Sequence, residues 1–124
     1  MVEQDYIMRI IHEVVRTFLK LVFHIDEEKQ EEVQFEDTEA AGSYETLCAM
    51  ADRGEINQAE NILYEELEES NLEYLKMAVL FYNHLNTMSN EFLEKCDYSR
   101  QEIAEGMKQV IKMYGYESLA ETLI

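Results

Sequence analysis

The sequence predicts an all-α protein, folded as a bundle of five or six helices. The chain of 124 residues has no proline and only four glycines, whereas sandwiches and barrels of strands need many turn residues. Its apolar residues recur at helical spacing, and several segments carry the capping signals of helix ends. With 47% hydrophobic residues, the chain is long enough to bury a core.

The first predicted helix, residues 5–24, has a wider apolar surface than an ordinary surface helix. Residues 6–25 comprise 13 apolar and seven polar residues. On a helical projection the polar ones span about 140° and leave about 220° apolar, whereas a surface helix needs little more than about 100°. One neighbouring layer cannot cover that surface. We therefore expect association with another chain through Ile7, Ile11, Val14, Val15, Phe18, Leu21 and Val22.

Charge divides the chain into three predicted segments. Residues 1–25 contain three acidic and three basic residues and are neutral, so the net charge of −17 lies entirely in the rest of the chain. Residues 26–39 include eight acidic residues and one lysine, which predicts a solvated acidic connector. Residues 40–124 form the predicted helical body. We interpret the neutral first helix as the association element.

The predicted body begins with a pair of helices. The first spans about residues 40–53 and ends at Gly54, because glycine favours the left-handed conformation that follows a helix. The second spans about residues 57–69. Asn57 is its expected N-cap, with Glu60 completing a capping box.

A longer helix and a short one are predicted next. Ser70 followed by Glu73 repeats the capping signal and predicts a helix over about residues 71–88. A short helical turn is expected to start at Ser89 or Asn90.

The clearest start signal belongs to the last long helix. Ser99 and Glu102 have the spacing of a capping box, which predicts a helix over residues 100–114. Gly115 is expected to end it. The short tail beyond it either docks on the body or frays.

The segment from Gly54 to Leu67 resembles the turn and second helix of a tetratricopeptide repeat. In that family a glycine permits a tight turn, a small residue lets the helices approach, and larger apolar residues follow. Gly54, Ala59, Leu63 and Leu67 occupy these places. The resemblance implies an antiparallel pair. The chain as a whole resembles a family of uncharacterised bacterial proteins with an amphipathic N-terminal helix and a tetratricopeptide-like body, which implies no assigned activity.

The sequence contains no pattern typical of a catalytic or metal site. Cys48 and Cys96 form no Cys-x-x-Cys pair, so we interpret both as small apolar side chains in a reducing cytosol. His12, His24 and His84 lie on polar faces, and none follows a glutamate at the spacing that di-metal bundles use. Nucleotide-binding and hydrolase motifs are missing. We expect a non-enzymatic protein without a cofactor.

Glu66 is the one charged residue inside a predicted apolar arc, between Ile62 and Leu63 in projection. An unpaired buried carboxylate is costly. We therefore expect Glu66 to bond a tyrosine, lysine or arginine and to mark a polar pocket between helices. The alternative is that it reaches the rim of the protein.

These features favour a cytoplasmic helical scaffold or interaction protein that forms a homodimer through its first helix, since a two-fold dimer is the commonest cover for such a surface. Two other roles stay open. A different protein covers the same surface of the first helix, or the acidic chain competes with nucleic acid for a basic partner. Peripheral membrane attachment is the main alternative: Arg9, Arg16 and Lys20 would face headgroups, while Phe18 and Phe23 enter the interface. The charge of −17 disfavours nucleic acid.

Overall fold

The computed structural model describes residues 2–24 and 35–123 and is all-helical in these ranges, which confirms the predicted fold class. The described residues form seven helices, because the tail adds one to the six helical segments that the sequence predicts. They are α1 (Val2–Phe23), α2 (Thr38–Asp52), α3 (Ile56–Glu66), α4 (Leu72–Asn86), α5 (Asn90–Lys95), α6 (Arg100–Met113) and α7 (Glu117–Leu123).

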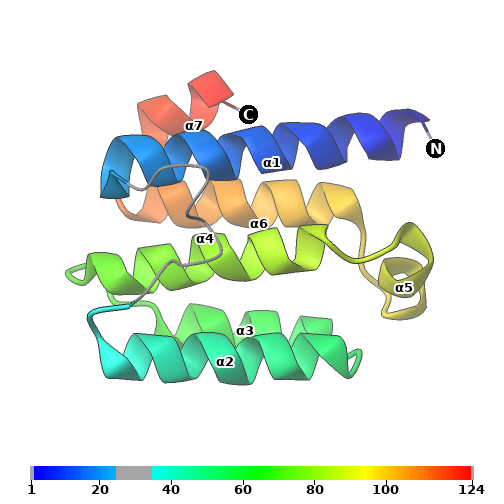
Figure 1. Ribbon diagram of the computed structural model, residues 1–124, viewed down its shortest axis with the longest axis horizontal. Coiled ribbons are helices and arrows are strands. Elements are labelled where there is room, and N and C mark those ends of the chain that lie inside the picture. The colour runs from blue at the N-terminus through cyan, green and yellow to red at the C-terminus, as the bar shows by residue number, and fades with distance from the viewer. Residues whose placement is uncertain (1, 25–34, 124) are drawn as a thin grey trace.

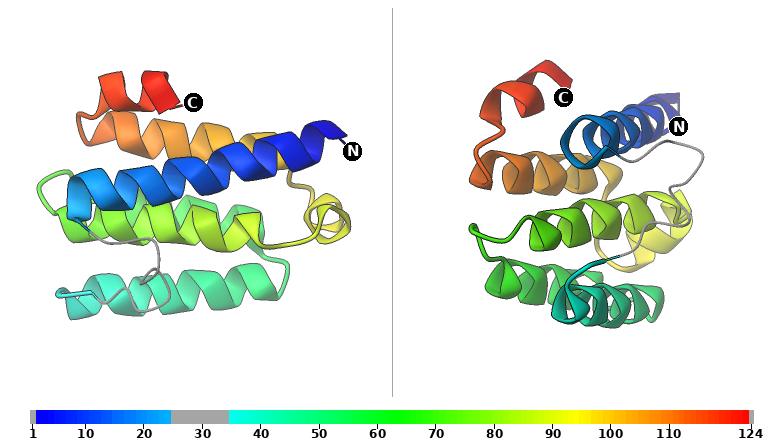
Figure 2. Two further views of the ribbon diagram at one scale, coloured as in Figure 1. Left: turned by 45° about the horizontal axis from the view of Figure 1, so that its top comes forward. Right: turned by 60° about the vertical axis from the view of Figure 1, so that its left-hand side comes forward.

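The long helices stack in three tiers (Figure 1). The first tier contains α2 and α3, the second α4 and α6, and the outer tier α1 and α7. α1 contacts both helices of the second tier, and α7 contacts α6. Both views in Figure 2 place α2 and α3 on the opposite side of α4 from α1, α6 and α7. Because α1 and α6 run in the same direction, their N-terminal halves lie at the same end of the molecule.

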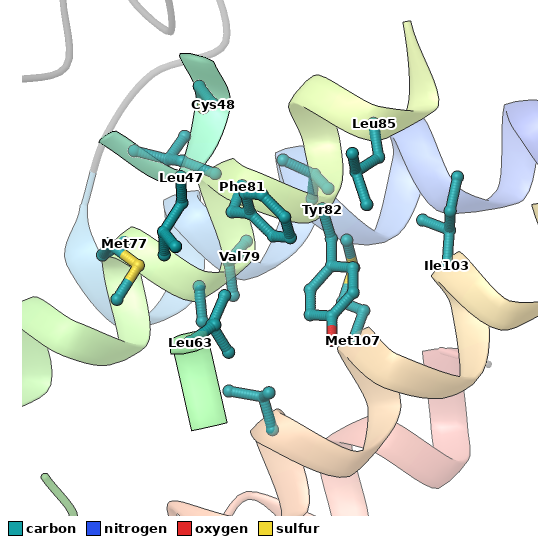
Figure 3. Close-up of a cluster of buried hydrophobic side chains, with 14 of the residues drawn as sticks. Leu47, Cys48, Leu63, Met77, Val79, Phe81, Tyr82, Leu85, Ile103 and Met107 are labelled. Carbon is teal, nitrogen blue, oxygen red and sulfur yellow. The ribbon is translucent and has the colours of Figure 1, made fainter. Parts of the chain in front are cut away.

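α4 is the central helix, and its residues 74–82 are all buried. Figure 3 shows side chains of α4 surrounded by those of α2, α3 and α6. Each large apolar side chain buried in this way contributes about 1.5–3 kcal/mol. The labelled members of this cluster are Leu47, Cys48, Leu63, Met77, Val79, Phe81, Tyr82, Leu85, Ile103 and Met107.

α1 belongs to the same hydrophobic core as the body. Ile11, Val15, Phe18 and Leu19 are buried in one cluster with residues of α4 and α6. Most of the predicted acidic connector falls on residues 25–34, which lie outside the described residues. Its last two residues, 38 and 39, already belong to α2.

Several predicted helix ends are confirmed. Ser99 and Glu102 form a complete capping box at the start of α6, and Ser89 caps α5. Gly54 and Gly115 both have positive φ angles, +93° and +87°, in the turns that follow α2 and α6. Glycine adopts this conformation without the strain that a Cβ atom introduces.

Two predicted caps are wrong. Asn57 does not cap α3, which begins after Glu55; its side chain instead donates to the carbonyl oxygens of Cys96 and Asp97. α4 is capped by Asn71, not by Ser70. The side-chain oxygen of Asn71 accepts a hydrogen bond from the backbone N–H of Glu73. For Asn57, a tertiary contact thus replaces the local cap.

A cluster of polar contacts joins the starts of α2 and α4. The carboxylate of Asp37 caps α2 by accepting the N–H groups of Glu39 and Ala40 at 2.9 and 3.2 Å. Its second oxygen accepts the side-chain amide of Asn71 at 2.8 Å. These bonds lower the pKa of Asp37, with the bond from Asn71 as the largest cause.

Glu73 extends this cluster to the end of α1. One oxygen accepts the N–H groups of Glu36 and Asp37, and the other lies 2.9 Å from the ammonium of Lys76. That ammonium also lies over the rings of Phe23 and Phe35, 5.5 and 5.6 Å from their centroids. Such cation–π contacts strengthen in a dry environment. The cluster therefore links α1, α2 and α4.

We predict that Glu73 makes folding sensitive to acid. Burial raises its pKa, but the bonds from Lys76, Asp37 and Glu36 outweigh burial, and the net pKa lies below its ordinary value of 4.5. A lowered carboxyl pKa stabilises the fold fully above about pH 4.5, and this contribution is lost as the pH falls through the folded-state pKa.

Urea unfolding of the wild type between pH 7 and pH 3 should show a steep loss of stability. Glu73→Gln should be less stable at pH 7 and should lose less on acidification. Parallel curves for the two proteins would refute this role for Glu73.

Candidate functional site: the groove between α1 and α6

The seven predicted association residues do not form one exposed surface. Ile11, Val14, Val15 and Phe18 are buried inside the chain's own core, at 3% exposure or less. The expectation that these four face a partner is therefore wrong. Its physical flaw was to assume one neighbouring layer, whereas α1 lies in the angle between α4 and α6.

The remaining three residues retain exposure to different degrees. Leu21 is 56% exposed, while Ile7 and Val22 are half-buried. Tyr6, which the sequence reasoning left out, is 59% exposed. The apolar surface that α1 itself leaves open thus lies beside its buried face and near its ends.

One flank continues into an open groove between the N-terminal halves of α1 and α6. Ile7 and Ile10 form one wall, and Gln101, Ala104 and Glu105 form the other. Ile7, Ile10 and Ala104 are all half-buried. The residues from α6 were missed, because sequence periodicity identifies the inner face of a helix but not the neighbour that shares its rim.

The other end of this side of the molecule is covered by α7. Figures 1 and 2 place α7 on α6, alongside the C-terminal half of α1. The ring of Tyr116 meets Phe18 edge-on, with 5.6 Å between centroids. Leu119 is half-buried and packs against the core.

Neither helix that lines the groove is net acidic: α1 has three acidic and three basic residues, and α6 has two acidic and three basic residues. Arg9 and Lys20 are exposed on α1, and Arg16 is paired with Glu13 on the same helix. Basic and acidic residues balance in residues 1–25, whereas the rest of the chain carries the net charge of −17. An approaching molecule thus meets less net negative charge along α1 and α6 than along α2 and α3, which carry three acidic residues each and no basic residue.

Glu66 has a partner of a different type from the one predicted. The hydroxyl of Ser43 on α2 donates to its carboxylate at 2.7 Å. Glu66 is half-buried, at the rim between α2 and α3. The bond joins the helix pair, and serine replaces the expected tyrosine, lysine or arginine because the short side chain suits the close approach of the two helices.

Glu60 holds the buried polar contact that sequence reasoning missed. Its carboxylate accepts hydrogen bonds from the hydroxyls of Tyr82 at 2.6 Å and Tyr98 at 2.9 Å. Burial is the largest cause that raises the pKa of both tyrosines, followed by the negative charge of Glu60. Both phenols therefore remain neutral donors. They tie α3 to α4 and to the start of α6.

Gly106 makes this arrangement possible. A Cβ atom at this position would lie 2.5 Å from the hydroxyl oxygen of Tyr82, and 2.6 and 2.7 Å from two ring carbons. The ring in Figure 3 is directed toward α6, where only a glycine leaves it room. Tyr64 also donates to the carbonyl oxygen of Gly106, at 3.4 Å.

Arg100 is a buried cation whose hydrogen-bond partners are neutral oxygens. Its guanidinium donates to the backbone carbonyls of Asn86 and Met88, and to the side-chain oxygens of Asn86 and Asn90. Burial lowers its pKa, an effect opposed by the charge of Asp5. The side-chain amide of Asn86 in turn donates to the carbonyl of Met8. Arg100 thus anchors the end of α4, and through it α1.

The histidines and cysteines that the sequence analysis considered for catalysis or metal binding do not come together in one site within the described residues. His84 bonds Asp52 at 2.7 Å, whereas His12 and His24 are exposed. Burial raises the pKa of the Cys48 thiol to about 12, so it stays protonated at neutral pH. Across the described residues, acidic, histidine and cysteine side chains form no group of three suited to a metal ion. Within the same ranges, no helix has the length and apolar character needed to cross a bilayer.

A comparison with protein families matches residues 1–115 to a family of unknown function, DUF6483. The match spans nearly the whole chain and includes both walls of the groove. The chain belongs to the DUF6483 family. This confirms the expectation of a family without an assigned activity. No curated protein and no solved structure matches the chain.

The end of the DUF6483 match coincides with a structural boundary. The match stops at Gly115, the left-handed residue of the turn that ends α6. α7 follows this turn and lies outside the matched residues. The residues that line the groove therefore lie within the part of the chain that matches the DUF6483 family. The helix α7 lies outside that part.

Proposed function

We propose that the protein is a non-enzymatic helical interaction protein that self-associates through the open groove between α1 and α6. The carrying observation is the groove itself, where Ile7, Ile10 and Ala104 stay half-exposed after folding. Contiguous apolar surface of this kind is typical of protein contacts. Tyr6 beside it adds an exposed aromatic ring, a side chain that is enriched at interfaces.

The distribution of charge supports a second copy as the occupant. Two chains of net charge −17 repel each other at most orientations. Repulsion is smaller when the α1 and α6 helices of the two copies face each other than when α2 or α3 does, because α1 and α6 carry no net negative charge. A two-fold axis beside α1 achieves this, since an isologous interface uses the same patch on both copies.

The size of the groove predicts a weak dimer. A stable interface buries about 800 Å² per partner. The open groove is lined by only five residues, two from α1 and three from α6. The dimer is therefore expected to dissociate on dilution, and its mass must be measured over a range of protein concentrations.

The decisive variant places a charge in the groove. Ile10→Glu should abolish the concentration-dependent rise in mass, because a carboxylate in a dry contact loses its hydration without a partner. The matched control is His12→Glu, an exposed position on the same helix that gains the same charge. Light scattering after size exclusion reports the mass, and circular dichroism confirms that both variants fold.

A wild type that stays at 14.7 kDa at every concentration contradicts self-association. Equal loss of association in the two variants would show that net charge alone, and not the groove, controls it.

The geometry does not favour the alternative of membrane attachment. Phe18, one of the two rings expected to enter the lipid, is fully buried and packed against Tyr116. Phe23 is half-buried beneath the ammonium of Lys76. Insertion of α1 would require that it leave the core, which costs the burial of several large apolar side chains.

A further inference from the structure

We propose that α7 is an internal cover that limits self-association by occupying one half of the α1–α6 surface. The inference rests on the proposed function and names its regulation. Its starting point is the position of α7, which packs on α6 beside the C-terminal half of α1 while the N-terminal half of the same surface is open.

α7 and the turn before it place apolar side chains on the core. Tyr116, just before the helix, packs edge-on against Phe18. Leu119 is half-buried against the core, whereas Glu117 and Glu121 are exposed. Tyr116 and Leu119 thus shield the part of the core around Phe18.

α7 is joined to α6 by a turn that does not depend on it. Gly115 donates to the carbonyl of Lys112 at 3.0 Å, and Tyr116 donates to that of Ile111 at 3.2 Å. This Schellman pattern satisfies the last carbonyls of α6 whatever follows it. α6 can therefore end in the same way when α7 leaves.

The helix α7 is too short to be stable alone. It has seven residues, whereas isolated helices below about 12–15 residues are marginal in water. Its stability depends on docking, so it opens at a lower free energy than the core. Detachment costs only its own contacts, and the buried residues of α1 remain packed on α4 and α6.

Detachment would uncover a second apolar area on the same side of the molecule as the groove. The open groove starts at Ile7, and the seat of Tyr116 on Phe18 lies 11 residues further along α1, or about 16 Å at the helical rise. The second area enlarges the apolar contact available to a second copy. Removal of residues 117–124 also deletes two carboxylates, Glu117 and Glu121, which lessens repulsion between copies.

The test compares the full chain with a chain that ends at residue 116 and carries Tyr116→Ala, which keeps the N–H bonded to Ile111 and removes the ring on Phe18. Sedimentation equilibrium should show that the truncated chain dimerises with a dissociation constant at least tenfold lower. Ile10→Glu in the truncated chain should restore the monomer. If the truncated chain dimerises while the full chain stays monomeric at every concentration, the result supports α7 as a cover. The same result refutes self-association of the full chain.

A point variant protects the test against misfolding of the truncated chain. Leu119→Asp in the full chain should loosen α7 and strengthen dimerisation in the same direction. Gln109→Glu, exposed on α6, adds the same charge and should leave the dissociation constant unchanged or raise it.

Three results overturn the cover. The first is dimerisation of the truncated chain and of Leu119→Asp that is no stronger than that of the full chain. This result leaves the proposed function unaffected. Monomers from every chain refute both proposals. Stronger dimerisation that Ile10→Glu does not reverse would place the new contact elsewhere.

Discussion

Replacing Arg100 by leucine should destabilise the protein by more than about 2 kcal/mol, because it leaves several acceptors at the end of α4 without a donor. The guanidinium satisfies the carbonyl oxygens of Asn86 and Met88 at the end of α4, together with two side-chain oxygens. Leucine offers no donor, so these buried acceptors would lose their partners at a cost of about 1–3 kcal/mol each.

Arg100→Lys is the informative companion variant. Lysine keeps the charge but lacks the planar fork of five donors that reaches several oxygens at once. It should recover only a minor part of the lost stability. Urea unfolding measures both variants. A loss below about 1 kcal/mol for Arg100→Leu would show that water replaces the guanidinium, because that is the ordinary value of a single exchanged hydrogen bond.

Gly106→Ala should destabilise the protein, although alanine is the better helix former. Overpacking of a tight core costs about 1–3 kcal/mol. Here the added methyl group would meet the Tyr82 ring at 2.5–2.7 Å, and the ring is itself held in place by its bond to Glu60. Thermal unfolding gives the difference directly.

Gly42→Ala is the matched control, since Gly42 lies in α2 with nothing within 4 Å of its missing Cβ. It should stabilise the protein by about 0.5–1 kcal/mol through helix propensity. Tyr82→Leu combined with Gly106→Ala should cost less than the sum of the two single changes, because the clash disappears with the ring. Strict additivity would rule out the steric explanation.

The helices were predictable because their signals are local. The capping box of Ser99 and Glu102, and the glycines at 54 and 115, specify helix ends through contacts within one turn, and the structure has them as expected. Where a distant group offers a better bond, the local signal fails. Asn57 bonds the backbone of Cys96 and Asp97 instead of capping α3.

The candidate site was predictable only in part, for a similar reason. Periodicity correctly indicates that α1 has more apolar surface than one neighbour covers. It does not show that two helices cover it, so Ile11 and Phe18 were assigned to an interface although they lie in the core. The groove residues Gln101 and Ala104 come from a helix more than 75 positions away, and no spacing rule relates them to Ile10.

The most direct test of the central claim is an NMR titration of the protein against its own concentration. Amide shifts that change with concentration should cluster at Tyr6, Ile7 and Ile10 on α1 and around Ala104 on α6, the residues in and beside the groove. Shifts that cluster on α2 and α3, or none at any concentration, would contradict self-association through this groove.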